Sequence, residues 1–373
     1  MTTNSINRIA PDSALSLRCP DAVIAAIPYL LGFQPSESLV IVWLSKNQVL
    51  LTLRVDLPPE ASSGDHMELS QTLAGAATNT AADAIIICVF TAATSDGQLP
   101  NTSLITKLMV DFYRLGVGVR DALLVRHRAE IGSAGAGGSD ECVRWWSYLG
   151  DDEGDATPGR VLDEQVSLYV RSRFALEGIA ALPGRVDLEH SLDPDTGRGP
   201  RVDSLITEIT KDLTKSLDDF KRAGSKAVSG ALERWRRESI DALVALVVEP
   251  EGRELSDRQV AQIVHSLGDI RVRDTLLWHL VRCADRHAPF EVLVTALRGA
   301  PAGRVAPIAT CTSICAWLLG DGARALVALD RAQVDDGEYS LAHLVARGLA
   351  AGLPPAFWTA AMAEVTEEQC RIG

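Results

Sequence analysis

Five side chains that could bind or act on an anion stand at the ends of predicted strands. Glu37 and Ser38 precede an apolar run, Arg54 and Asp56 close the next strand, and His127 ends a later one. Arginine binds carboxylate and phosphate groups through paired hydrogen bonds, while carboxylates and imidazole can accept or donate a proton. Gathered at one edge of a sheet, these residue types would form a small anion site.

The first two strands read as a β-hairpin. Residues 39–44 are apolar on both faces, as in a central strand, and residues 49–57 alternate apolar and polar side chains. A four-residue loop between the strands fixes the register, which places Glu37 near Asp56. The hairpin would therefore bring the four polar residues of its open end together.

The direction of the second strand decides which other strand ends join them. If it runs parallel to the strands predicted at 84–90 and 119–127, all three carboxyl ends lie at one edge of the sheet. Open α/β sheets bind ligands in the crevice at that edge. The alternative is an ordinary salt network on the sheet surface, and for these residue types the network is the favoured interpretation.

The order of elements predicts an α/β domain followed by a helical one. Residues 1–160 alternate as β-β-α-β-α-β, which indicates a mixed sheet, and an acidic break with glycine and proline at 151–159 marks the domain end. Residues 161–373 carry apolar side chains at helical spacing and short turns, typical of stacked antiparallel helices. A linker and polar loop fall around 183–202. A half-match to a tetratricopeptide unit at 325–337 favours an irregular bundle over a repeat array.

A second constellation lies in the helical half. His279, Cys283 and His287 recur every four residues, which would place them along one face of a helix predicted over 270–287. With two cysteines on a later helix, they could bind zinc or iron. Zinc sites are more often built on tight turns, so packed helix seams are favoured, and we expect no metal and no cofactor.

Composition narrows the function classes. The 373 residues carry 49 acidic and 36 basic side chains, and the net charge of −13 disfavours binding to nucleic acid. No apolar stretch reaches membrane-spanning length, the first 18 residues lack the apolar core of a signal peptide, and seven scattered cysteines suggest reduced thiols. We therefore expect a cytoplasmic protein that neither enters a membrane nor binds nucleic acid. One basic cluster, typical of a solvated helix face, comprises Lys221, Arg222, Lys226, Arg234, Arg236 and Arg237.

The N-terminal run also carries a family resemblance. Residues 28–35 and 38–40, followed by residues 54–58, resemble the actinobacterial family known as domain of unknown function 4192. Two later stretches, 144–149 and 317–355, are similar to the same family. The family name implies no activity, so the resemblance assigns no catalytic residue.

Two functions from different classes remain open. The first is an uncharacterised cytoplasmic binding or scaffold protein, whose helical half binds a protein and whose α/β half holds a small anion. The second is a hydrolase or transferase that acts on an anionic small molecule at the carboxyl edge of the sheet. The missing nucleophile elbow, zinc-protease motif and dinucleotide fingerprint favour the first function. The sequence leaves the partner, catalysis and the oligomeric state open.

Overall fold

The computed structural model describes residues 17, 19–46, 48–59, 63–80, 82–94, 97–129, 141–150, 158–221, 225–250, 252 and 254–372. The chain divides into two units, which we describe one at a time. The first unit comprises residues 1–188 with the short segments 321–323 and 348–354, and the second comprises the remainder. A mixed sheet with helices precedes an all-helical region, which confirms the predicted fold class.

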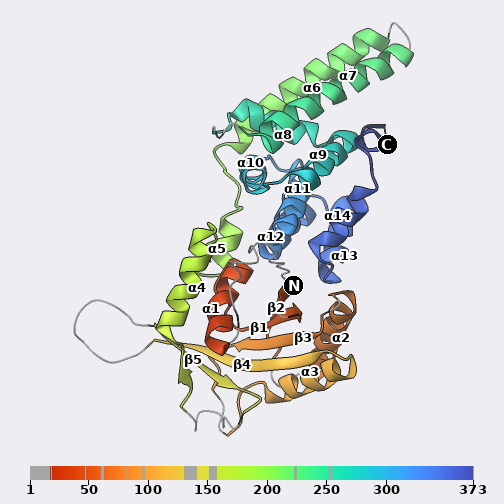
Figure 1. Ribbon diagram of the computed structural model, residues 1–373. Helices are drawn as coiled ribbons and strands as arrows, with labels where there is room; N and C mark the ends of the chain where they lie inside the picture. Colours follow the sequence, from red (N-terminus) through yellow and green to blue (C-terminus); the bar gives the residue numbers. More distant parts are fainter. Residues whose placement is uncertain are drawn as a thin grey trace, which may run out of the picture. The chain divides into compact units, whose positions relative to one another are not determined.

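A mixed sheet with the strand order β2-β1-β3-β4-β5-β6 organises the first unit (Figure 1). Strand β1 is antiparallel to both β2 and β3, and β3 is parallel to β4. Strands β2, β3 and β4 therefore run in one direction, and their carboxyl ends lie at the same edge of the sheet. This meets the condition stated above for bringing the candidate residues to one edge. The strands are β1 (Ser38–Ser45), β2 (Gln48–Asp56), β3 (Ala84–Phe90), β4 (Gly118–Ala129), β5 (Glu141–Ser147) and β6 (Arg160–Val161).

Helices α2 (Ser63–Thr80) and α3 (Thr102–Arg114) share one core with the sheet, which includes Leu39, Ile41 and Trp43. They cover the same face because both crossovers advance across the sheet in the same direction, and such connections are right-handed. The strand order therefore does not reverse between them. Among the strands that the structure describes, no reversal opens the crevice found in doubly wound sheets.

Helix α1 (Pro20–Leu31) contacts β2 and β4, and its outer side packs against α4 (Glu164–Leu176). Tyr29 of α1 stacks on Phe174 of α4, with ring centroids 4.8 Å apart. The Asp21 carboxylate accepts hydrogen bonds from the Trp145 indole and the Asp163 backbone N–H. Because α1 is apolar on two sides, it needs α4 as a second cover. The first unit therefore extends to Leu188, past the break predicted near residue 160.

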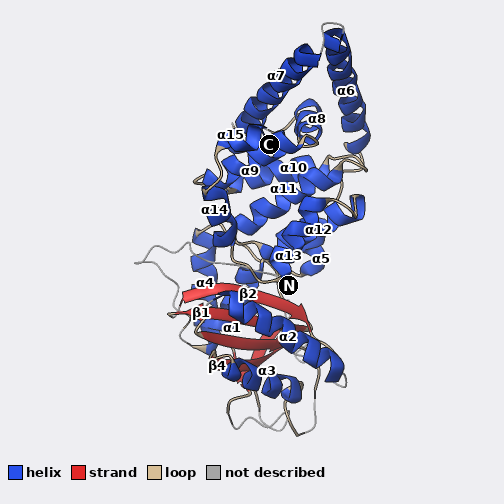
Figure 2. Cartoon of the chain, turned by 90° about the vertical axis from the view of Figure 1, so that its right-hand side faces the viewer, coloured by secondary structure: helices blue, strands red, loops and turns tan. Residues whose placement is uncertain are grey.

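The second unit is built of helices around α11, whose residues are nearly all buried. Helices α8, α9, α10 and α14 all pack against α11. Helices α6 and α7 form a long antiparallel pair, and Figure 2 shows α8 between their roots. The elements that follow α4 are α5 (Arg185–His190), α6 (Gly199–Lys221), α7 (Ser225–Leu243), a π-helical turn (Val244–Val248), α8 (Asp257–Ser266), α9 (Ile270–Arg282), α10 (His287–Arg298), α11 (Val305–Leu318), α12 (Gly322–Asp335), α13 (Ser340–Ala350), α14 (Pro355–Ala363) and α15 (Glu367–Ile372). In the described part of the chain, no helix combines the length and apolarity needed to span a bilayer.

Candidate functional site

The hairpin pairs one residue away from the expected register. Ser38, rather than Glu37, lies opposite Asp56. The register shifts just before Leu44, because β2 contains Leu50 as an extra residue. Loop length alone does not reveal such a bulge, and a shift of one residue moves every side chain beyond it to the other face of the sheet.

The bulge places Arg54 on the same face as Ser38 and Asp56. The Arg54 side chain is only 8% exposed, and its Nε donates a hydrogen bond of 2.8 Å to Ser38 Oγ. Its Nη2 lies 2.6 Å from Asp56 Oδ1, and the Asp56 side chain is 79% exposed. The Ser38 hydroxyl donates in turn to the backbone carbonyl of Ser36, at 2.6 Å. The guanidinium is thus buried inside a chain of polar contacts with an exposed carboxylate at its outer end.

Glu37 links the ends of β1, β2 and β3. Its carboxylate accepts one hydrogen bond from Thr91 Oγ1 and one from the Ala92 backbone N–H, each 2.8 Å long. Its backbone carbonyl accepts from the N–H of Leu57, at 3.1 Å. Glu37 is also a non-glycine residue at φ +43°, a conformation that persists only where surrounding contacts enforce it. These contacts explain the strained backbone of Glu37, and they occupy its carboxylate with hydrogen bonds from Thr91 and Ala92.

His127 lies apart from Arg54 and Asp56. Strands β1 and β3 separate β4 from β2, so three strand spacings, about 14 Å, divide their backbones. The His127 imidazole contacts the Gln34 side-chain amide instead, at 2.9 Å. The structure therefore brings Ser38, Arg54 and Asp56 together, places Glu37 beside them, and leaves His127 outside the group. The Ser38 hydroxyl meets an arginine and a carbonyl, so it is not paired with a general base.

The predicted helix over 270–287 is broken, which separates the candidate metal ligands. Helix α9 ends at Arg282, Cys283 has extended backbone, and His287 opens α10. His279 faces Glu367 at 3.4 Å, and the Cys283 thiol donates to the Asp285 carbonyl. Among the residues that the structure describes, no three His, Cys, Asp or Glu side chains gather as metal ligands would.

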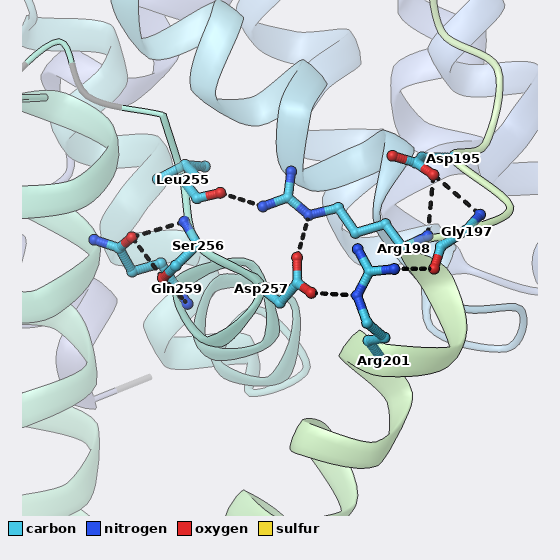
Figure 3. Close-up of polar contacts among 8 residues, drawn as sticks. All are labelled: Asp195, Gly197, Arg198, Arg201, Leu255, Ser256, Asp257 and Gln259. Atoms are coloured by element: carbon cyan, nitrogen blue, oxygen red, sulfur yellow. Dashed lines mark hydrogen bonds and ion pairs between the residues drawn. The ribbon is translucent and has the colours of Figure 1, made fainter.

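Sequence reasoning missed a polar cluster at the root of α6 (Figure 3). Asp257, the first residue of α8, accepts hydrogen bonds from Arg198 Nε at 2.8 Å and Arg201 Nε at 2.6 Å. The hydrogen bonds from Arg201 and then Arg198 lower the pKa of Asp257. Arg198 also donates to the carbonyl of Leu255. This cluster joins α6 to α8 and is structural.

The sequence signals for this cluster are local. Asp195 accepts from the backbone N–H groups of Gly197 and Arg198, each at 3.0 Å, and so shapes the entry into α6. Ser256 and Gln259 form a reciprocal capping box at the start of α8. A Ser-x-x-Gln pattern before an apolar run is a recognisable helix start, so this half of the cluster was open to prediction.

Beyond α8, helices α6 and α7 continue as a two-helix hairpin, and we call its residues 211–221 and 225–234 the arm (Figure 1). Its apolar side chains meet along a seam, yet Ala231 alone is buried among the described arm residues. The root of the same helix differs, because Ile206 is fully buried there. The half-buried seam side chains are Leu213, Leu217, Phe220, Val228 and Leu232.

A family model described as domain of unknown function DUF4192 matches residues 20–356. The chain belongs to this family. No curated protein and no solved structure gives a significant match. The match includes both the sheet edge and the arm.

Within this DUF4192 chain, the two regions differ in what they can do chemically. The sheet edge offers one buried guanidinium, already paired, and carboxylates held by hydrogen bonds. The arm offers apolar surface that a further helix would cover.

Proposed function

We propose that this DUF4192 protein is a cytoplasmic binding or scaffold protein without catalytic activity, and that the arm is its protein-binding surface. The half-buried seam of the arm carries the proposal. Two helices alone cover each other on one side only, and bundles normally use a third or fourth helix to complete the burial of such a seam. Helix α8 supplies that third helix at the root, where Ile206 is fully buried.

The polar contacts of the sheet edge support a non-catalytic reading. The carboxylate of Glu37 accepts hydrogen bonds from Thr91 and Ala92. The Ser38 hydroxyl contacts an arginine and a backbone carbonyl rather than a carboxylate or an imidazole. A catalytic nucleophile needs a base within hydrogen-bond reach. The free thiols among the described cysteines suit a reducing compartment, which supports the cytoplasmic location. The actinobacterial origin rests on the resemblance in the N-terminal run.

A hydrolase or transferase for an anionic small molecule is the second candidate, and it includes simple anion binding as its first step. One observation favours it: Arg54 is buried, while its carboxylate partner Asp56 is exposed. An incoming carboxylate or phosphate would displace an exposed side chain and gain a buried guanidinium.

The arm is tested by affinity capture from a lysate of the source organism. Leu217→Glu inserts a charge into the seam, and Lys215→Gln is the matched control, because it changes the net charge by the same amount on an exposed arm residue. We expect a partner that the wild type and Lys215→Gln retain and that Leu217→Glu loses. Capture that is equal for all three proteins would contradict the proposal.

The anion site is tested by thermal shift. Wild type and Arg54→Ala are melted with phosphate and with a panel of small carboxylates. A ligand that raises the melting temperature of the wild type but not of Arg54→Ala would favour the second candidate. If no anion shifts the wild type, the sheet edge is structural.

A further inference from the structure

Two thiols of the second unit contact the turn that joins α9 to α10. Cys283 follows the last residue of α9 and is half-buried, and its Sγ donates a hydrogen bond of 2.7 Å to the carbonyl of Asp285. Cys315 is buried in α11, and its Sγ lies 3.8 Å from the carbonyl oxygen of Arg286. Because Asp285 and Arg286 are consecutive residues, the two sulfur atoms contact the same short stretch of backbone.

Polar contacts hold this turn against the end of α9. Arg286 Nε donates to the carbonyl of Leu280 at 2.7 Å, and its Nη2 donates to the carbonyl of Val281. The Asp285 carboxylate accepts a hydrogen bond of 2.9 Å from the backbone N–H of His287, the first residue of α10. Helix α11 packs against both α9 and α10. The carbonyls that the thiols contact are therefore held in place beside α11.

The two thiols differ in their access to solvent. Burial raises the pKa of Cys315 to about 12, and Cys283 is among the groups whose charge adds to this effect. The Cys283 sulfur therefore lies within electrostatic range of the Cys315 sulfur. Cys283 is also partly open to solvent and has extended backbone outside the helix. An oxidant that arrives from solvent reaches Cys283 first.

We propose that Cys283 and Cys315 form a reversible intrachain disulfide when the protein meets a peroxide. The Cys283 thiolate attacks one oxygen of hydrogen peroxide and the O–O bond breaks, which gives a sulfenic acid on Cys283 and one water molecule. The Cys315 thiolate then attacks the sulfenic sulfur, the S–S bond forms, and a second water molecule leaves. Two thiols are oxidised, one peroxide is reduced, and the two thiol protons end in the two water molecules.

Its position makes Cys315 the partner of the sulfenic acid. A buried thiol is rarely ionised and reacts slowly with reagents in solution, but a neighbouring group within the molecule reacts at a high effective concentration. Cys311, one turn earlier on α11, has Arg273 and Asp274 near the start of α9 as charged neighbours. Cys311 therefore lies toward the opposite end of α9 from Cys283, although it is as fully buried as Cys315.

Formation of the bond requires the turn to approach α11, because a disulfide holds its two Cα atoms within about 7 Å of each other. Cys315 lies inside a buried helix, whereas Cys283 and the residues up to Arg286 lie between two helices and can shift. Once formed, the bond joins the α9–α10 turn covalently to α11. The pair is thus a redox-sensitive cross-link, open in a reducing compartment and closed by oxidation.

Peptide mapping of the full-length protein tests the cross-link. The reduced protein is treated with hydrogen peroxide, its remaining thiols are alkylated, and it is digested without reductant. Trypsin releases Cys283 within residues 283–286, and Cys311 and Cys315 together within residues 305–324, because arginine precedes and ends both peptides. We expect these two peptides to be linked after peroxide treatment and separate after dithiothreitol.

Three variants assign the bond. Cys311→Ala is the matched control, because it removes an equally buried thiol from the same helix, and it should keep the linked peptides. Cys315→Ala should lose them and accumulate the sulfenic acid of Cys283, which dimedone labels. Cys283→Ser should lose both the link and the dimedone label at this position. Fragmentation of the linked wild-type peptides gives the same assignment without a variant.

Other results overturn the proposal. One is a wild type in which peroxide oxidises Cys283 to sulfenic or sulfinic acid without linking the two peptides. A second is a link that Cys311→Ala abolishes, and a third is a link that joins two molecules, seen as a dimer on a non-reducing gel. None of these outcomes depends on the arm, so the proposed function is tested separately.

Discussion

At the carboxyl edge of the sheet, polar side chains bind one another, whereas in the arm apolar side chains remain partly uncovered. Arg54 and Glu37 direct their hydrogen bonds to neighbours in the same unit. Leu217 and Leu232 of the arm remain half-buried. A satisfied polar group gains little from a ligand, because binding merely exchanges one hydrogen bond for another. Partly exposed apolar surface does gain, since covering it releases water. The polar residues of the sheet edge are therefore a less favourable binding surface than the apolar side chains of the arm.

The comparison assumes that the core of the second unit around α11 is closed to solvent, and the reactivity of its buried cysteines measures this. Burial raises the pKa of Cys311 and of Cys315 to about 12, from an ordinary value of 9.0. The thiolate is the reactive form, so at pH 8 both should react about a thousandfold more slowly than an ordinary thiol. Cys283 is only half-buried and should react first of the three. Residue-resolved alkylation followed by mass spectrometry checks the order. Equal rates would mean that α11 opens readily.

The same two thiols predict an alkaline limit to stability. A folded-state pKa above the unfolded value means that the neutral thiols stabilise the fold fully below pH 9, and that this contribution is lost as the pH rises toward 12. Denaturant unfolding between pH 8 and 11 should show the decline. Cys315→Ala should decline less steeply than the wild type, and an unchanged slope would contradict the burial of this thiol.

One substitution made in both regions compares them directly. Arg54→Ala removes a buried guanidinium with two polar partners and should lower the free energy of unfolding by about 2 kcal/mol. Arg234→Ala removes an exposed guanidinium over the Phe220 ring, 5.7 Å from its centroid, and should cost about 0.5 kcal/mol. Urea titration of the two variants checks the ratio. Equal losses would remove the distinction between the two regions.

The parts of the fold set by hydrophobic periodicity were predictable. The apolar runs that became β1 and β3 followed from residue types and from the alternation of helices with strands, whereas the sequence states the direction of β2 only as a condition, which the structure meets. The register of the hairpin was not predicted correctly. Leu50 is apolar where the alternation of the strand expects a polar side chain, but one such exception does not by itself mark an extra residue. The shift is only one residue, yet it places Arg54 and Ser38 on the same face of the sheet.

Long-range packing limited the other predictions. His127 was expected at the site because it ends a strand, but sequence does not state how many strands lie between two strand ends. The periodicity over 270–287 continued through a helix break, because the turn from Cys283 to Arg286 contains neither glycine nor proline. The exposure of Leu168 and Leu176 also escaped notice, since apolar residues on a helix are normally assigned to the core.

A smaller difference in stability is expected between substitutions of the two carboxylates at the sheet edge, Glu37 and Asp56. Glu37→Gln keeps the shape but weakens the hydrogen bonds from Thr91 and Ala92, and should lower the free energy of unfolding by about 1 kcal/mol. Asp56→Asn acts on an exposed ion pair and should cost about 0.3 kcal/mol. Thermal melts at matched pH compare them. A larger loss for Asp56→Asn would indicate that Asp56, and not the buried chain behind it, organises the edge.

The smallest expected change in stability is that of Asp257→Asn at the root of the arm. There, as at the sheet edge, charged side chains bond one another. Hydrogen bonds from Arg201 and Arg198 lower the pKa of Asp257 below its ordinary value of 3.8. A lowered folded-state pKa means that the carboxylate stabilises the fold above pH 3.8, and that this contribution is lost as the pH falls through the folded value. Wild type should therefore be slightly more stable than Asp257→Asn at pH 6, and the difference should vanish in acid.

Hydrogen exchange locates this loss. In Asp257→Asn at pH 6, amides of the first turns of α6 and α8 should exchange faster, while those of the arm should exchange as in the wild type. The reason is that Asp257 joins α6 to α8 only at the root, and the arm lies beyond α8. If the arm also exchanged faster, its seam would depend on the root, and the arm would not be an independent surface. In that case the polar cluster at the root would control the packing of the arm, and the arm could not be compared with the sheet edge as a separate region.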